Sequence, residues 1–537
     1  MCPNSCAGYT GPYSALDKCP ECNEDRYADS SGKKKSRQNF YTMPLGPQLQ
    51  MLYNTPEGAD NASHRKRQLA EILRELELSD GFIKNYDDVW YSQEYLDAVS
   101  RGDIKDDDIV LMFSMDGAQL YEHKQSDCWI YMWVIFDLPP NLRYKKRYVI
   151  PATVIPGPGN IKNSDSFAYP SFHHLSALQK EGLRIYNSRT GAIFTSHPYL
   201  FLGSADGPGS THLGLVGHHG AQPCRLYCGI RGHHKPGVPH YYPALLKPDN
   251  YAVRGCDHDD MDPLVFLSRP TDEAPQRYHK NLLHLLASRN MTDYKEHRKL
   301  TGISGVSIFS GLSPHHRLPI PSGFPGDSMH APTLNLGDLL VPLWHGTFQC
   351  ASTDDIGSWD WAVLKDDVWI KHGEAVGDSK PYLPGFFDHA PRNIEKKGSS
   401  GYKAKEYQGY FYGLGPALLF GILPDAYWEN FCKIVFSIRI LHQHSISSEQ
   451  LMDAQKYLVE GCLEFEALYG QRRTDRLHII RPVVHAILHM AAETVRLGPP
   501  PLYSTWTMER MIGSLGREIR QPLKPYQNLS ERALLRC

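Results

Sequence analysis

The fold is predicted from the stretch IVLMFSMDG (residues 109–117), a short apolar run that ends at Asp116-Gly117. Two further runs follow at 129–136 and 148–155, and they are rich in the aromatic and β-branched residues that strands favour. The connections between the three runs are short, so they are expected to form an antiparallel meander.

After the meander, the stretch 172–183 has helical character, and an apolar run at 199–202 leads to Asp206-Gly207. The predicted order is therefore strand-strand-strand-helix-strand. A crossover helix returns the fourth strand parallel to the first, so Asp116 and Asp206 are expected at the same edge of the sheet. This arrangement predicts an α/β fold with an RNase H-like mixed sheet core.

Two aspartates at one sheet edge indicate a site for divalent metal ions. Mg²⁺ or Mn²⁺ prefers oxygen ligands, and two such ions roughly 3.5–4 Å apart can activate an attacking oxygen and stabilise the leaving oxygen of a phosphodiester. Taken singly, each Asp-Gly pair is also explained as a turn that ends a strand. The strand order around Asp116 and Asp206 favours the metal site over two unrelated turns.

A third carboxylate is expected from a helix that packs beside the first strand. The best candidate is Glu509, in a helical stretch at 504–520 whose apolar residues share one face. A glutamate near a helix N-terminus is also common without any site. Asp327, in a Gly- and Pro-rich loop before Met329-His330, is the alternative third acid.

The first 22 residues contain four cysteines in the pattern C-x3-C and C-x2-C, namely Cys2, Cys6, Cys19 and Cys22. Four thiolates at this spacing can close a tetrahedral Zn²⁺ site, and such a site folds a segment too short to build its own core. We expect a zinc-ribbon-like module at 1–28.

A second cysteine pair is Cys224 and Cys228, followed by His233, His234 and His240. Two thiolates and two imidazoles also satisfy Zn²⁺. The expected ligands are Cys224, Cys228, His234 and His240, and His233 is an alternative to either histidine. The alternative is a buried cysteine pair among surface histidines. The pair His218-His219 is expected to lie on the surface or to face DNA.

The chain has 537 residues, of which 41% are hydrophobic and 22% charged, as is usual for globular domains. No stretch approaches the roughly 18–20 apolar residues that cross a bilayer, and no signal peptide opens the chain, so a non-membrane, non-secreted protein is expected. A net charge of −2 argues against a protein that binds nucleic acid through a surface that is basic all over. Local basic runs remain, either as solvated surface or as contacts to DNA: 33–37, 64–67 and 144–147.

Five segments are expected from the distribution of these features. They are a zinc-binding module (1–28), a linker and helical segment (29–100), the first part of the core (101–210), a large, mostly helical insertion with the Cys/His motif at its start (211–495), and a core completion helix that carries the third acid (496–537).

The motifs along almost the whole chain match one family. They are MCPNSC (1–6) with CPEC (19–22), SDCWIY (126–131), SALQKEGL (176–183), VGHHG (216–220), HYYPALL (240–246), SWDWAVL (358–364) and WTMER (506–510). On these motifs the chain resembles CACTA-type (En/Spm-like) DNA transposases, particularly the form found in fungal genomes.

The resemblance implies a cut-and-paste transposase with an acidic triad of Asp116, Asp206 and Glu509 that binds Mg²⁺ or Mn²⁺. It also implies binding to DNA at transposon ends, a homo-oligomer in a synaptic complex, and nuclear localisation. In RNase H-like transposases a large, mostly helical insertion can separate the second aspartate from the glutamate, and the stretch between Asp206 and Glu509 resembles such an insertion.

Two departures from the family pattern bear on activity. The second acid stands in Ala205-Asp206-Gly207-Pro208, where relatives more often have Asn-Asp-Phe-Pro. The chain is also expected to be a fragment or a decayed copy, since family members usually extend further at both ends. The alternative function is therefore an inactive, transposase-derived, zinc-stabilised DNA-binding or regulatory protein. A zinc hydrolase built on the Cys/His cluster is a third hypothesis.

Overall fold

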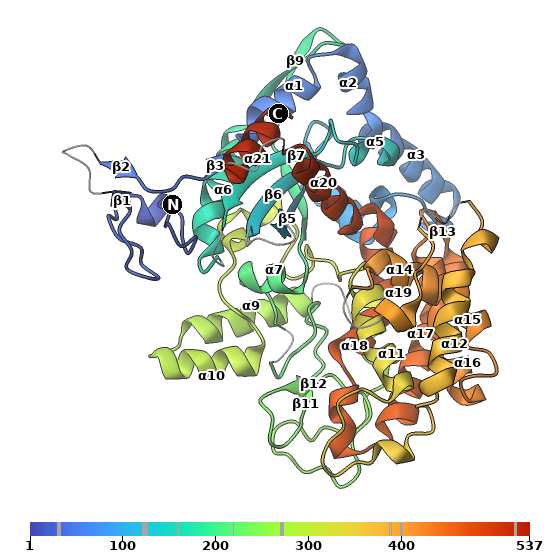
Figure 1. Cartoon of the computed structure of the whole chain (residues 1–537). Helices are drawn as coiled ribbons and strands as arrows, with labels where there is room; N and C mark the ends of the chain where they lie inside the picture. The colour runs from blue at the N-terminus through green and yellow to red at the C-terminus, as the bar shows by residue number, and fades with distance from the viewer. Residues whose placement is uncertain are drawn as a thin grey trace.

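The computed structural model describes residues 1–28, 34–120, 127–157, 161–217, 220–268, 273–385, 387, 389–397, 401–519 and 524–536 (Figure 1). It is a mixed α/β structure. A five-stranded sheet has the order β10-β5-β6-β7-β3, and its strands in chain order are β3 (Tyr41–Thr42), β5 (Val110–Gln119), β6 (Asp127–Ile135), β7 (Ile150–Pro156) and β10 (Tyr199–Ser204).

The pairing within this sheet follows the order predicted from the sequence. Strands β5, β6 and β7 are antiparallel neighbours, and β10 runs parallel to β5 on the other side. Helix α6 (Ser164–Glu181) lies between β7 and β10 in the chain and makes the crossover. The strand-strand-strand-helix-strand order is confirmed.

Three details of the sheet differ from the expectation. Strand β5 continues through Asp116 to Gln119, because Asp116 and Gly117 still pair with Ile130 and Trp129 of β6; Asp116 thus lies inside the strand and not at its end. A separate hairpin, β8 (Leu183–Asn187) and β9 (Ala192–Ser196), is inserted between α6 and β10. The two-residue strand β3 adds an edge beside β7.

Both faces of the sheet are buried, and the alternation along β5 shows this directly. Val110 and Met112 belong to one hydrophobic core, whereas Leu111, Phe113 and Met115 belong to the other. The second core contains residues of α1 (Leu45–Leu52) and α6. The first contains residues of α4 (Gln93–Ser100), α20 (Trp506–Arg517) and α21 (Pro525–Leu534), so the last two helices of the chain cover the sheet that its first half builds (Figure 1).

Two buried arginines join the segment before β5 to this sheet. Arg65, on α3 (His64–Leu78), donates through Nε to Asp137 Oδ1 at 2.8 Å, and Asp137 Oδ2 accepts from the Val110 amide at 2.7 Å. Arg143 donates to both carboxylate oxygens of Asp88, at 2.9 and 3.0 Å. The segment expected to be a linker and helices therefore packs into the sheet domain.

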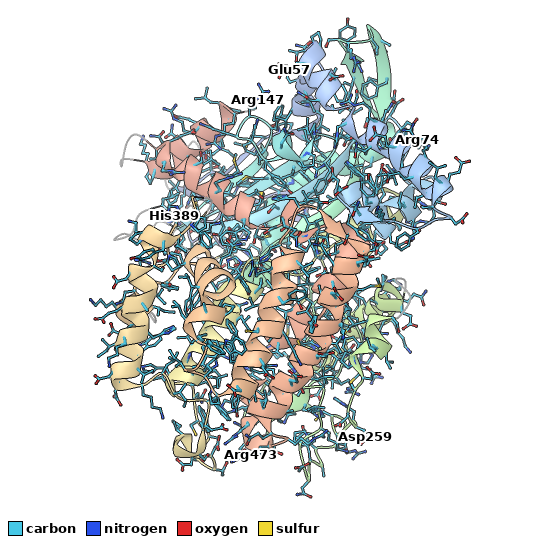
Figure 2. The ribbon with its side chains drawn as sticks, turned by 90° about the vertical axis from the view of Figure 1, so that its right-hand side faces the viewer. Glu57, Arg74, Arg147, Asp259, His389 and Arg473 are labelled. Carbon is cyan, nitrogen blue, oxygen red and sulfur yellow. The ribbon has the colours of Figure 1, made fainter. Side chains whose placement is uncertain are left out.

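A helical region occupies most of the chain between β10 and α20. Its main helices stand side by side below the sheet, with Arg473 and Asp259 at the far end and Glu57 and Arg147 at the sheet end (Figure 2). These helices are α11 (Leu336–His345), α16 (Asp425–Leu441), α17 (Ser448–Phe465), α18 (Pro482–Leu488) and α19 (Met490–Leu497). No described helix has both the length and the apolar composition needed to cross a membrane.

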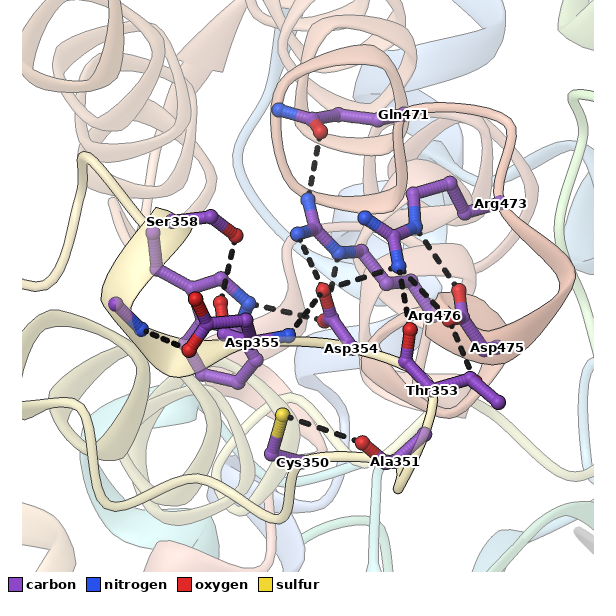
Figure 3. Close-up of polar contacts among 12 residues, drawn as sticks. Cys350, Ala351, Thr353, Asp354, Asp355, Ser358, Gln471, Arg473, Asp475 and Arg476 are labelled. Atoms are coloured by element: carbon purple, nitrogen blue, oxygen red, sulfur yellow. Dashed lines mark hydrogen bonds and ion pairs between the residues drawn. The ribbon is translucent and has the colours of Figure 1, made fainter.

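At the far end of this region, a buried aspartate fixes a long loop. Asp354 accepts hydrogen bonds from Arg476 Nε at 2.8 Å and Arg476 Nη2 at 2.7 Å, and it also accepts one from Trp359 Nε1 at 2.9 Å (Figure 3). Arg473 pairs with both Asp354 and Asp475 (Figure 3). This network ties the loop around Asp354 to the connection between α17 and α18.

Candidate functional site

The parallel pairing of β10 with β5 places two aspartates at one edge. Ser204 is paired with Ser114, and each serine precedes an aspartate by two residues. Asp116 Oδ1 accepts from the Gly117 amide at 2.7 Å. Asp206 Oδ1 accepts from the Gly209 amide at 2.6 Å and so caps α7 (Gly207–His212). The sheet thus brings together the two acids that the sequence indicated.

Helix α20 brings Glu509 to the same edge. The helix packs on β5 through a buried face formed by Met508, Met511, Ile512 and Leu515. Glu509 lies in its first turn with its side chain 45% exposed. Burial, followed by the charges of Asp206 and Glu509, raises the pKa of Asp116 to about 7. Asp116 therefore lies within electrostatic range of both other carboxylates.

His330 links the two candidates for the third acid. Its Nδ1 lies 2.7 Å from Asp327 Oδ2, and its Nε2 lies 3.0 Å from Glu509 Oε1. Asp327 is itself held by the backbone amides of Met329 and His330, at 3.2 and 2.9 Å. Although burial of the ring opposes protonation, the hydrogen bonds to Asp327 and Glu509 raise the pKa of His330 to about 10. Asp327 thus supports Glu509 through an imidazolium.

A cavity of about 460 Å³ opens beside these residues. Its lining includes Asp206, Arg225, Asp327 and His330. His485 and His489, whose place in a metal group is described below, also line it. The cavity therefore adjoins both the acidic edge and the second cysteine group.

The three acids are spaced more widely than the ligands of a single ion. Among the described residues, two groups bring three or more ligand atoms within 4.8 Å of one another, and both contain cysteines. Asp116, Asp206 and Glu509 are not among them. Carboxylates that repel one another spread apart, and a pair of ions spans more space than one ion.

The N-terminal cysteines converge as the sequence predicts. The ligand atoms of Cys2, Cys6, Cys19 and Cys22 all lie within 4.8 Å of one another, and the Cys2 and Cys22 sulfurs are 3.5 Å apart. This spacing matches a Zn–S tetrahedron with bonds of about 2.3 Å. The group could hold a metal ion such as zinc.

This cysteine module docks on the start of α6. The carbonyl of Cys6 accepts from the amides of Lys162 and Asn163, at 3.1 and 2.9 Å. The Gly8 amide donates to Ser166 Oγ at 2.8 Å. A metal ion held by the four thiolates would fix this contact surface.

The second cysteine pair is completed by different histidines from those expected. Cys224 Sγ lies 3.5 Å from His489 Nε2, Cys228 Sγ lies 3.4 Å from His485 Nε2, and the two Nε2 atoms are 3.0 Å apart. All four side chains are buried and form one group that could hold a metal ion such as zinc. The partners Cys228 and His485 are 257 residues apart in the chain.

This group corrects the ligand set expected from the sequence, because His234 and His240 are not part of it. His234 packs against Tyr241 instead, with ring centroids 4.9 Å apart and the planes tilted by 55°. The reserve candidate His233 bonds the Cys256 carbonyl at 2.8 Å. The signal that was missed is the H-x3-H spacing of the true pair, which places two imidazoles one turn apart in a helical stretch.

Three features named from the sequence lie outside the described residues in whole or in part. They are His218-His219, Ser126 of the SDCWIY motif, and Lys33 of the first basic run.

Comparison of the chain with protein-family models and with curated proteins finds no match.

Proposed function

We propose that this protein is a DNA transposase of the acidic-triad type, built on an RNase H-like core. The observation that carries the proposal is the parallel pairing of β10 with β5, because it sets Asp206 beside Asp116 at the edge that α20 supplies with Glu509. The three antiparallel strands, the crossover helix and the parallel fourth strand support the RNase H-like assignment. The motifs shared with CACTA-type transposases support the same function.

The donor set of the acidic edge fits divalent metal ions. Asp116, Asp206 and Glu509 offer only carboxylate oxygens, the ligands that Mg²⁺ and Mn²⁺ prefer. Burial, followed by the charges of Asp206 and Glu509, raises the pKa of Asp116, so a bound cation would favour its ionised form. Bound ions would supply positive charge to the reacting phosphate and lower the pKa of the attacking group.

The proposed reaction is an exchange of phosphodiester bonds. In the first step a water oxygen bonds to phosphorus and the bond to the 3′ oxygen breaks; the water loses a proton to solvent, the 3′ oxygen gains one, and a 3′-hydroxyl and a 5′-phosphate remain. In the second step this 3′-hydroxyl attacks a phosphorus of the target strand in the same way. Asp116, Asp206 and Glu509 would hold the ions, and His330 fixes Glu509 through the contact of its Nε2 with Oε1.

Cleavage of plasmid DNA tests the proposal. We expect the zinc-loaded full chain to nick supercoiled DNA in Mg²⁺ or Mn²⁺ and to leave 3′-hydroxyl ends. Asp116→Asn and Glu509→Gln should each lower the nicking rate by about 100-fold or more. Glu531→Gln, an exposed residue on α21, is the matched control and should keep the wild-type rate.

Two outcomes would change the conclusion. Loss of nicking in Asp327→Asn with full activity in Glu509→Gln would make Asp327 the third acid. Binding of DNA without any metal-dependent nicking would favour the second candidate, an inactive transposase-derived protein stabilised by zinc. That candidate is supported by the two cysteine-containing groups, which need no acidic site.

The resemblance to CACTA-type transposases extends the proposal to the protein's setting. It favours transposon end sequences as the DNA partner, a homo-oligomer that pairs two ends, and action in the nucleus.

A further inference from the structure

Arg225 lies between the two metal-binding cysteines and faces the acidic site. It follows Cys224 directly, and it lines the same cavity as Asp206, Asp327 and His330. Its Nη1 donates to the Ala205 carbonyl at 3.0 Å, and Ala205 is the residue before Asp206. The guanidinium is thus attached to the backbone of the sheet edge itself.

The hydrogen-bonding capacity of this guanidinium is largely unused. Its Nε is buried and has no hydrogen-bond partner, and within the described residues Arg225 makes no ion pair within 4.0 Å. A buried donor without a partner is costly, and a charged one more so. The side chain therefore has donors ready for a ligand in the cavity.

Two of the carboxylates that line the same cavity, Asp327 and Glu493, are already engaged elsewhere. Asp327 binds His330, while Glu493 accepts from the Gly326 amide at 2.9 Å and pairs with Arg496 at 3.2 Å. Neither of them satisfies Arg225. Because Arg225 Nε has no partner among the described residues, an acceptor that enters the cavity from outside would satisfy it, and a guanidinium binds phosphate oxygens in a matching fork.

We propose that Arg225 binds a backbone phosphate of DNA at the acidic edge, and that the group of Cys224, Cys228, His485 and His489 holds it in place. This inference rests on the proposed function. The unused N–H groups would donate to a non-bridging phosphate oxygen next to Asp206. Arg225 is therefore a substrate-binding residue that supplies positive charge where the carboxylates alone would repel the strand.

The loop that carries Arg225 is fixed from both ends. On one side its two cysteines lie against His485 and His489. On the other side the buried Tyr227 donates through its hydroxyl to the Thr301 carbonyl at 2.8 Å. A metal ion in the Cys/His group would hold the guanidinium at a set distance from the sheet edge, as outer interactions do in preorganised sites.

DNA binding without cleavage tests the inference. The zinc-loaded full chain is titrated with a labelled duplex of about 30 base pairs in Ca²⁺, over a series of salt concentrations. We expect Arg225→Gln to raise the Kd about tenfold and to reduce the slope of log Kd against log salt by about one, as loss of one phosphate contact does. Arg225→Lys should recover part of the affinity but not all of it.

The matched control is Arg231→Gln, an exposed arginine of the same segment. It should leave both Kd and slope unchanged. Zinc content and melting temperature of each variant show whether the loop is intact. A second arm replaces single phosphates of the duplex by uncharged methylphosphonates, and one position should weaken wild-type binding while leaving the Arg225→Gln protein unaffected.

The outcomes separate this inference from the proposed function. If Arg225→Gln keeps its zinc and binds DNA with the wild-type Kd and salt slope, the inference is overturned, whatever the cleavage assay shows. If the protein never cleaves DNA but Arg225→Gln loses affinity and slope as described, the phosphate site stands and the transposase activity does not.

Discussion

Asp116→Asn is expected to stabilise the protein at alkaline pH in the absence of Mg²⁺. The carboxylate is half-buried in β5 and lies near the negative charges of Asp206 and Glu509, so its ionised form is disfavoured in the folded state. Asparagine keeps the size of the side chain and can still accept the hydrogen bond from the Gly117 amide at 2.7 Å. The substitution removes the charge and little else.

The size of the effect follows from the pKa of Asp116, which rises from 3.8 to about 7 on folding. Because the folded pKa is raised, the wild-type protein loses stability as pH rises from about 4 to about 7, and the full penalty of about 4 kcal/mol applies above pH 7. The variant carries no such penalty. Its advantage should therefore grow by about 2 kcal/mol between pH 5.5 and pH 8.

Urea-induced unfolding of the zinc-loaded protein measures this advantage, with the fluorescence of its nine tryptophans as the signal. Asp107→Asn, which removes an exposed partner of Lys66, is the control and should change stability by about 0.5 kcal/mol or less. Added Mg²⁺ should stabilise the wild type and not Asp116→Asn. A gain that is absent at pH 8, does not vary with pH, or is unaffected by Mg²⁺ would contradict a raised pKa of Asp116 at a cation site.

Three further substitutions test the rest of the architecture. Cys228→Ser should remove one equivalent of zinc in metal analysis and lower the melting temperature; retention of the metal would contradict the Cys/His ligand set. Cys6→Ser should remove the other equivalent and open residues 1–28 to protease while the unfolding of the sheet is unchanged; a stable module would argue against a structural metal. Arg143→Met should cost about 3–5 kcal/mol in urea unfolding because Asp88 is left buried without its partner, and the loss should shrink when Asp88→Leu is added.

The central sheet could be predicted from the sequence because both of its faces are buried. Long apolar runs then mark β5, β6 and β10, and the acids that end or interrupt them stand out. Strand β3 is only two residues long and is held by its neighbour β7, so no local pattern marks it. Asp116 was expected at the end of its strand, but a ladder of backbone hydrogen bonds continues past it without an apolar signal.

The candidate site was predictable only where its residues carry a local signal. The cysteine quartet is confined to 22 residues, so its spacing is enough. His485 and His489 lie far from Cys224 and Cys228 in the sequence, and only tertiary packing brings the four residues together. Histidines closer to the cysteines in the sequence were therefore predicted as ligands. The supporting role of Asp327 was missed for a similar reason. From the sequence, Asp327 and Glu509 are alternative candidates for the third acid, whereas in the structure His330 contacts both of them.

The order in which the acidic edge receives its residues has a consequence for the protein as it is being made. Glu509 leaves the ribosome 303 residues after Asp206, and the helices that cover the sheet, α20 and α21, emerge in the same late stretch. At roughly 5–20 residues per second, the interval between Asp206 and Glu509 lasts roughly 15–60 s. During that time α20 and α21 do not yet cover their face of the sheet, and exposed apolar surface of this kind is a binding site for chaperones. The acidic edge also lacks Glu509. If the acidic edge acts as proposed, a nascent chain would not cleave DNA before Glu509 has been synthesised.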